Sequence, residues 1–269
     1  MKRILDGYAR FRRDVFPTWK DRFQLLADRQ APDTLFVTCA DSRVVPDLIL
    51  QTEPGDIFVC RTAGNIIPPH GQMAGGVSST VEYAVEVLHV RHIIVCGHSD
   101  CGAIKAVLPP EGAGRGAVRN MTLLPLTAKW LGFVEPAWGH LDPRVPREDR
   151  QALHTALIHA NVIAQYENLK THPEVSRGLL HGTLRIHGWY YDILTGAIEA
   201  YDPRLRRFIP TCRPLKSWRG AIFSTFSKPR ATTRATLPRC SASAARRFTA
   251  CSSDGACGIE TACGSLERL

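Results

Sequence analysis

Short apolar segments alternate with amphipathic ones through residues 1–209, and this alternation constrains the fold more than any other feature. Five segments are rich in β-branched and aromatic residues and are bounded by polar residues or glycine, as buried strands are. They are residues 35–38, 56–59, 92–95, 183–187 and 197–201. Apolar side chains recur at helical spacing within 77–88 and 153–169. The alternation predicts an α/β fold with a mostly parallel central β-sheet flanked by helices.

Composition divides the chain into three parts. Residues 1–29 alternate charged and apolar side chains and are expected to form a helical arm outside the sheet, and residues 30–209 form the expected α/β domain. Residues 210–269 are basic, rich in Ser, Thr and Ala, and without apolar periodicity. Such a composition cannot bury enough apolar surface to fold, so we expect a disordered C-terminal extension.

The formal net charge of +9 belongs mainly to this extension. Residues 210–269 contain ten Lys/Arg and three Asp/Glu, whereas residues 1–209 contain 24 and 22. The near-neutral α/β domain argues against specific nucleic-acid binding. Three explanations of the extension stay open: a partner-binding segment, a charge contact with nucleic acid or a membrane surface, and an error of reading frame.

Composition also bears on the compartment. No apolar run approaches the roughly 20 residues that span a membrane, and residues 1–26 lack the apolar centre of a signal peptide. The nine cysteines are too sparse in 269 residues for a disulfide scaffold, so they are interpreted as thiols or metal ligands. We therefore expect a cytoplasmic protein.

Two short segments with metal-binding side chains each follow an expected strand. They are Cys39-Ala40-Asp41-Ser42-Arg43 and His98-Ser99-Asp100-Cys101-Gly102. Ligands gather at the carboxyl ends of strands in parallel sheets, so the two segments are expected to converge. Cys, His and Asp are ligand types that Zn²⁺ takes in tetrahedral geometry. The sequence therefore predicts a zinc site, with Arg43 placed to compete with the metal for Asp41.

The chain resembles the β-class carbonic anhydrases over residues 20–202. The resemblance is carried by motifs in the family's order: CADSRVVP, EPGDIFVCRTAGNIIPP, GGVSSTVEYAVEVL, IIVCGHSDCGAIKAVL and LRIHGWYYDILTG. It extends, less specifically, to the cyanobacterial carboxysomal subgroup through QYENLKTHPEV and a C-terminal extension. It implies that residues 30–209 are a catalytic domain for the reversible hydration of CO₂ to bicarbonate and a proton by a zinc-bound hydroxide.

The resemblance also implies roles for the metal-site residues. Cys39, His98 and Cys101 would bind one Zn²⁺ per subunit, with Asp41 either the fourth ligand or paired with Arg43. If Arg43 holds Asp41, the fourth position is open to water and the carboxylate can accept the proton of that water in a hydrogen bond. If Asp41 turns to the metal instead, it displaces the water and the enzyme is off.

The substrate pocket is expected to be apolar, because CO₂ has neither net charge nor dipole. By resemblance Val44, Phe58 and Tyr83 form its wall, Gly102 lies beside it, and Gln30 reaches it from the neighbouring subunit. This implies a homodimer or a higher even oligomer. The subgroup resemblance adds a carboxysomal location as an alternative to a purely cytoplasmic one, with a carboxysome-type partner bound through the extension.

One departure from the family concerns regulation. Some bacterial members have an inhibitory, bicarbonate-binding Trp-Arg-Tyr arrangement, and this chain has Arg61 and Tyr191 at the matching positions but Phe36 in place of the tryptophan. Phenylalanine lacks the indole N–H donor, so we expect weak or absent bicarbonate inhibition.

Two other functions fit the same motifs. One is hydrolysis of CS₂ or COS, linear molecules that the same zinc hydroxide can attack. The other is a zinc-stabilised scaffold protein that docks through its basic extension. A purely structural zinc site has no use for a competing Asp-Arg pair, which favours an enzyme.

Overall fold

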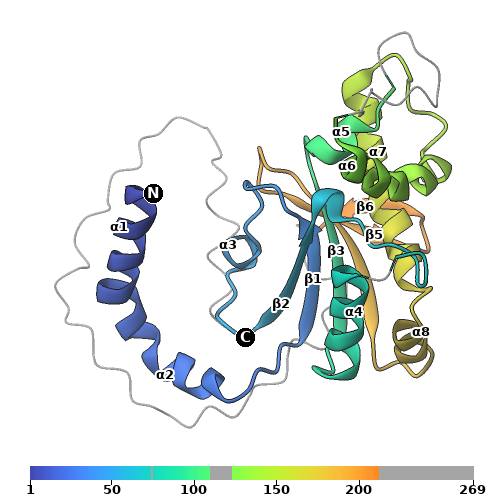
Figure 1. Cartoon of the computed structure of the whole chain (residues 1–269). Coiled ribbons are helices and arrows are strands. Elements are labelled where there is room, and N and C mark those ends of the chain that lie inside the picture. The colour runs from blue at the N-terminus through green and yellow to red at the C-terminus, as the bar shows by residue number, and fades with distance from the viewer. Residues whose placement is uncertain (74, 110–122, 212–269) are drawn as a thin grey trace, which may run out of the picture. The chain divides into compact units, whose positions relative to one another are not determined.

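The protein is described by a computed structural model that covers residues 1–73, 75–109 and 123–211 (Figure 1). Six strands form one mixed sheet in the order β2-β1-β3-β4-β5-β6. The strands are β1 Thr34–Cys39, β2 Ile57–Thr62, β3 His92–His98, β4 Arg185–Tyr191, β5 Ile198–Asp202 and β6 Arg207–Pro210. The first four pair in parallel, whereas β5 and β6 are antiparallel additions at one edge.

Helices and 3₁₀ segments connect the strands. They are α3 Pro46–Leu50, η2 Ala63–Asn65, α4 Gly76–Glu86, α5 Gly102–Ala106, α6 Pro125–Leu131, η3 Gly132–His140, α7 Arg150–Leu169 and α8 Pro173–Leu180. In the part of the chain that the structure describes, none of the helices is long and apolar enough to cross a membrane. The predicted α/β fold with a mostly parallel sheet is confirmed.

The strands of the structure differ from the predicted ones in their limits and in one additional strand. The fourth strand was expected at 183–187, but β4 continues to Tyr191 because its second half pairs with β3 as far as His98. β6 was not predicted, because its four residues show no alternation of their own and pair only with the neighbouring β5.

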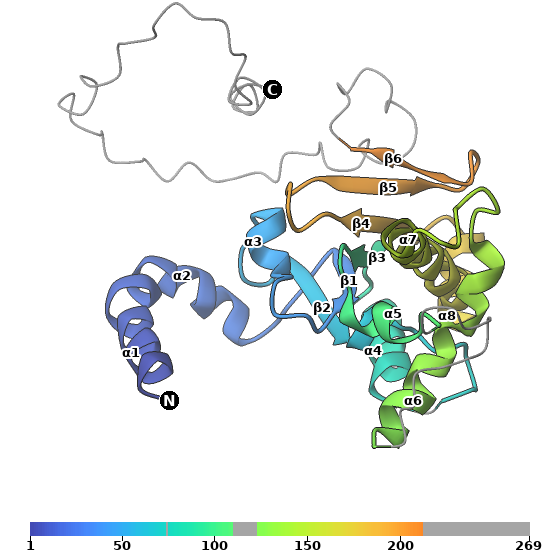
Figure 2. The same cartoon turned by 90° about the horizontal axis from the view of Figure 1, so that it is seen from above.

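The two faces of the sheet are covered unequally. Leu35, Val37, Ile93 and Val95 point to the face on which α4, α7 and α8 pack, and they belong to a core cluster with apolar residues of these helices. Phe36, Ile94 and Cys96 point to the other face, where α3 contributes Leu50. Figure 2 shows α3 and α4 on opposite sides of the strands.

A glycine lets α7 lie directly on the sheet. Gly97 in β3 faces α7, and a Cβ at this position would lie 2.7 Å from a methyl group of Val162 and 3.2 Å from one of Ile158. Any larger residue would push α7 away from β3. This close approach places polar residues of α7 near the carboxyl edge of the sheet.

The predicted N-terminal helical arm consists of α1 Lys2–Arg10, the π-helical segment η1 Phe11–Val15 and α2 Phe16–Ala27. No residue of α1 is buried, and Ile4, Leu5 and Tyr8 are at least 59% exposed. Residues 212–269 lie outside the described residues, so the expected extension and the domain limits at 29/30 and 209/210 stay predictions.

Candidate metal centre

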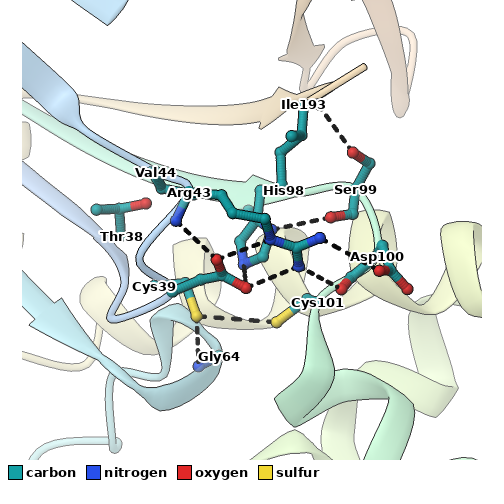
Figure 3. Close-up of polar contacts among 12 residues, drawn as sticks. Thr38, Cys39, Arg43, Val44, Gly64, His98, Ser99, Asp100, Cys101 and Ile193 are labelled. Carbon is teal, nitrogen blue, oxygen red and sulfur yellow. Dashed lines mark hydrogen bonds and ion pairs between the residues drawn. The ribbon is translucent and has the colours of Figure 1, made fainter. Parts of the chain in front are cut away.

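Three of the predicted ligands meet at the carboxyl edge of the sheet. Cys39 is the last residue of β1, His98 is the last residue of β3, and Cys101 precedes the first turn of α5. β1 and β3 are parallel neighbours with Thr38 opposite Cys96, so their ends lie side by side. The convergence expected from the two sequence segments is therefore present in the fold (Figure 3).

The spacing of the three side chains suits a tetrahedral zinc ion. The two Sγ atoms are 3.9 Å apart, and all three potential ligand atoms lie within 4.8 Å of one another. Two sulfurs held about 2.3 Å from a tetrahedral ion would be roughly 3.8 Å apart. Cys39, His98 and Cys101 are 5%, 0% and 1% exposed, so an ion at this position would be well shielded from water.

The imidazole of His98 is oriented as a ligand. Its Nδ1 lies 2.9 Å from the carbonyl oxygen of Ser99 and donates to it, which leaves a lone pair on Nε2. Nε2 is buried and has no hydrogen-bond partner. A buried nitrogen without a partner is costly, and a metal ion would remove that cost. The backbone carbonyl thus plays the orienting role typical of the outer shell of zinc sites.

The two thiols influence each other's ionisation. A hydrogen bond from Cys101 lowers the pKa of Cys39 to about 4. The negative sulfur of Cys39 and burial in turn raise the pKa of Cys101. The pair therefore holds one proton between two sulfurs, and a divalent cation is the species that would stabilise both thiolates together.

Asp41 is paired with Arg43. Arg43 donates to Oδ1 from its backbone N at 2.9 Å and from Nε at 3.0 Å, and to Oδ2 from Nη2 at 2.8 Å. These bonds hold the pKa of Asp41 far below its usual range. Oδ2 lies 3.9 Å from Nε2 of His98, but Asp41 is not in the group of three mutually close ligands. Of the two arrangements left open by the sequence, the structure has the Asp41–Arg43 pair.

Asp100 holds the same guanidinium from the other side. Arg43 donates from Nη1 to Oδ2 of Asp100 at 3.3 Å and from Nη2 to the Asp100 carbonyl oxygen at 3.1 Å. Lys105 lies 3.5 Å from the second carboxylate oxygen of Asp100. Asp100 was not among the predicted site residues, although its place between His98 and Cys101 in the sequence was a usable signal.

Arg61 fastens the loop that carries Asp41. Its guanidinium donates to the carbonyl oxygens of Cys39, Asp41 and Val44 at 3.1, 2.7 and 2.7 Å. These bonds keep the 39–44 loop in place against β2. Of the residues considered for bicarbonate inhibition, Phe36 is 1% exposed and packs edge-on against Trp189.

Two of the predicted substrate residues lie near the metal centre. Val44 is fully buried, and its carbonyl oxygen is one of those that Arg61 holds. Gly102 directly follows Cys101, and an added Cβ there would meet no atom within 4 Å. Open space therefore lies beside the ligand Cys101.

The other three predicted substrate residues lie away from it within one chain. Phe58 is paired with Leu35, four residues before Cys39, which is about 13 Å along the strand. Its ring contacts Tyr83 at a centroid distance of 6.0 Å, and Tyr83 lines a hollow of about 640 Å³ together with Gln30. Phe58 and Tyr83 therefore lie away from the metal centre of their own chain, and their expected place in the pocket wall stays a prediction.

Comparisons with known proteins find relatives of a single family. The profile of the carbonic anhydrase family matches residues 34–198. A carbonic anhydrase of Pseudomonas aeruginosa is 48% identical over 209 residues, which cover 78% of this chain and 91% of the relative. The solved structure of the β-carbonic anhydrase CcaA has a TM-score of 0.69 at 38% identity and covers 78% of this chain and 98% of its own. One of two tetrameric β-carbonic anhydrases of Sordaria macrospora has a TM-score of 0.53 at 31% identity, with coverages of 73% and 96%.

Replacing Cys39, His98 or Cys101 by Ala is expected to lower the zinc content from about one ion per chain to near zero, because two remaining ligands cannot hold a tetrahedral ion. Elemental analysis after gel filtration measures this. Cys60→Ala is the control, since Cys60 is a buried cysteine of β2 outside the group. Full zinc content in His98→Ala would contradict the assignment.

Proposed function

This chain belongs to the β-class carbonic anhydrases and catalyses the reversible hydration of CO₂ with Zn²⁺ as its cofactor, and we propose that Cys39, His98 and Cys101 hold that ion. The single observation that carries the proposal is the buried group of two sulfurs and one unpartnered imidazole nitrogen within 4.8 Å of one another. Hydrolysis of CS₂ or COS and a scaffold role have no comparable support.

Zinc held by these residues would lower the pKa of a coordinated water towards neutrality and so supply a nucleophile for CO₂. Two thiolates already balance the charge of the ion, so neighbouring groups have to contribute to the reaction. The backbone N–H of Gly64, 3.3 Å from Sγ of Cys39, withdraws charge from one thiolate. Asp41 is the neighbouring group best placed to act on the water itself.

We propose that Asp41 accepts a hydrogen bond from that water. A carboxylate has about four acceptor positions, and Arg43 occupies three of them. The position left is on Oδ2, which is the oxygen 3.9 Å from Nε2 of His98. Because Arg43 lowers the pKa of Asp41, the carboxylate stays ionised wherever the enzyme works and acts as a fixed acceptor.

We further propose that Arg43 keeps Asp41 away from the metal. The guanidinium of Arg43 also donates to Asp100, so two aspartates fix its position. The low pKa of Asp41 means that its pairing contributes stability above the ordinary carboxyl pKa of about 4, and this contribution is lost as the pH falls towards the lowered pKa. At working pH the pair therefore favours an open fourth position.

For the substrate pocket we propose that Val44 and Gly102 act within one chain, whereas Gln30, Phe58 and Tyr83 act on the site of a neighbouring subunit. The separation of Phe58 from Cys39 within one chain supports this division, as do the hollow that Gln30 and Tyr83 share and the ring contact between Tyr83 and Phe58. The exposed apolar residues of α1 supply surface for a second copy. The Sordaria macrospora relatives are described as tetrameric. We therefore propose a homodimer or a higher even oligomer.

We propose a cytoplasmic or carboxysomal location, with a carboxysome-type partner bound through residues 210–269, on the sequence resemblance alone.

The catalytic proposal is tested first by stopped-flow CO₂ hydration with the purified, zinc-replete chain between about pH 7 and pH 9, the range in which metal-activated water is deprotonated. We expect zinc-dependent turnover that a chelator abolishes and added Zn²⁺ restores. Complete absence of CO₂ hydration in zinc-replete protein would falsify the proposal. Turnover of COS or CS₂, measured side by side, is expected to be slower.

Arg43→Ala is expected to lower kcat/KM about 10–100-fold, because Asp41 loses its partner and turns to the metal. X-ray absorption at zinc should show a carboxylate oxygen in place of water. Arg144→Ala is a matched control, since Arg144 makes the same bidentate pair with Asp142 on the surface. Unchanged kcat/KM and unchanged zinc coordination in Arg43→Ala would rule out the switch.

The intersubunit pocket predicts complementation between two inactive variants. When Gln30→Ala and Cys101→Ala protomers are mixed and reassociated, activity should rise, because the intact zinc site of one protomer receives Gln30 from the other. A mixture of His98→Ala and Cys101→Ala is the control and should stay inactive, since both defects are in the metal site. No recovery in the first mixture would mean that Gln30 does not act across subunits.

A further inference from the structure

A row of three buried amide side chains lies along α7. Asn161, Gln165 and Asn168 are 0%, 0% and 9% exposed, at a helical spacing that puts them on one face. Burying amide groups costs free energy unless each is hydrogen-bonded. Their presence among the apolar residues of α7 therefore requires a structural reason, which lies in what they hold.

The three amides form hydrogen bonds with the backbone of residues 64–67, the segment that follows β2. Asn161 donates from Nδ2 to the Gly64 carbonyl oxygen at 3.0 Å, and Asn168 donates from Nδ2 to the Ile67 carbonyl oxygen at 2.9 Å. Gln165 accepts from the backbone N–H of Ile67 at 2.9 Å and donates to Oδ1 of Asn161 at 3.0 Å. The bond from Gln165 fixes the orientation of the Asn161 amide, so that its Nδ2 faces Gly64.

Gly64 connects this row to the metal centre. Its backbone N–H donates to Sγ of Cys39 at 3.3 Å, while its carbonyl oxygen accepts from Asn161. Gly64 has a φ of +75°, and a Cβ there would lie 3.2 Å from the Cβ of Ala103 in α5. Only glycine adopts this conformation readily in so narrow a space. The segment thus approaches the sulfur closely enough for its N–H to reach it.

Trp130 of α6 forms a hydrogen bond with the residue that precedes Gly64. Its indole Nε1 donates to the Ala63 carbonyl oxygen at 2.9 Å. That carbonyl belongs to the same peptide unit as the Gly64 N–H, so a donor on the oxygen polarises the N–H that faces the sulfur. Trp130 therefore fixes the peptide unit before the Gly64 Cα, and Asn161 fixes the peptide unit after it.

We propose that Asn161 and Trp130 are positioning residues that together direct the Gly64 N–H at Sγ of Cys39 and so tune how strongly this thiolate binds the metal. An N–H···S bond draws charge from the sulfur, and groups of this kind commonly adjust metal affinity. Neither residue touches the reacting atoms. The inference rests on the proposed role of Cys39 as a zinc ligand.

The test uses the full chain with Co²⁺ in place of zinc and compares Asn161→Ala, Trp130→Phe and Asn168→Ala. The first two should shift the thiolate-to-cobalt charge-transfer band to longer wavelength, because the sulfur loses charge withdrawal. Asn168→Ala is the matched control: it removes a neighbouring buried amide that holds Ile67 but not Gly64, and it should leave the band in place.

Unshifted bands in both Asn161→Ala and Trp130→Phe would overturn the inference, as would an equal shift in Asn168→Ala, which would indicate general loosening. Trp130→Phe keeps an aromatic ring and removes only the indole donor, so it carries the test if Asn161→Ala does not fold. Absence of any thiolate band in the wild-type cobalt protein would instead overturn the proposed zinc ligands themselves, which separates the two failures.

Discussion

Parallel pairing of β1 with β3 is the interaction on which the rest of the structure depends. It brings the carboxyl ends of two strands together, so that Cys39 and His98 share one edge although they are far apart in the sequence. Both strands are entirely buried, with apolar residues on both faces. A shift of one residue in register would turn every side chain to the wrong face, so the burial of the sheet also protects the metal geometry.

The same burial makes the centre depend on a cation. Two buried sulfurs lie 3.9 Å apart, so that ionisation of Cys39 raises the pKa of Cys101, and the Nε2 of His98 has no hydrogen-bond partner. Such groups are costly in an apolar interior unless a cation compensates them. Metal binding and folding stability are therefore linked at this site. The Gly64 N–H and the Ser99 carbonyl oxygen orient two of the ligands before the ion arrives.

The Asp41–Arg43 pair shows how a local motif acquires a function from its surroundings. Asp142 and Arg144 form the same contacts at 2.9, 3.0 and 2.7 Å, with the Arg144 side chain 88% exposed. The pairing is therefore a property of an Asp-x-Arg turn and forms without a metal site beside it. Only Asp41 is mostly shielded and lies 3.9 Å from a ligand nitrogen. Its position, not its pairing, makes it a candidate for catalysis.

The sequence by itself determined the strands that carry the site, the ligand types and the Asp-x-Arg turn, because apolar periodicity and short motifs are local properties of the chain. It did not reveal the Asp100 contacts or the Asn161–Gly64–Cys39 connection, since each joins residues that are distant in sequence. It also did not reveal β6, whose four residues show no alternation of their own. Only the tertiary structure decided that Phe58 and Tyr83 lie away from the Cys39 of their own chain, because the strand register, which no local pattern encodes, sets how far along the sheet each residue lies from Cys39.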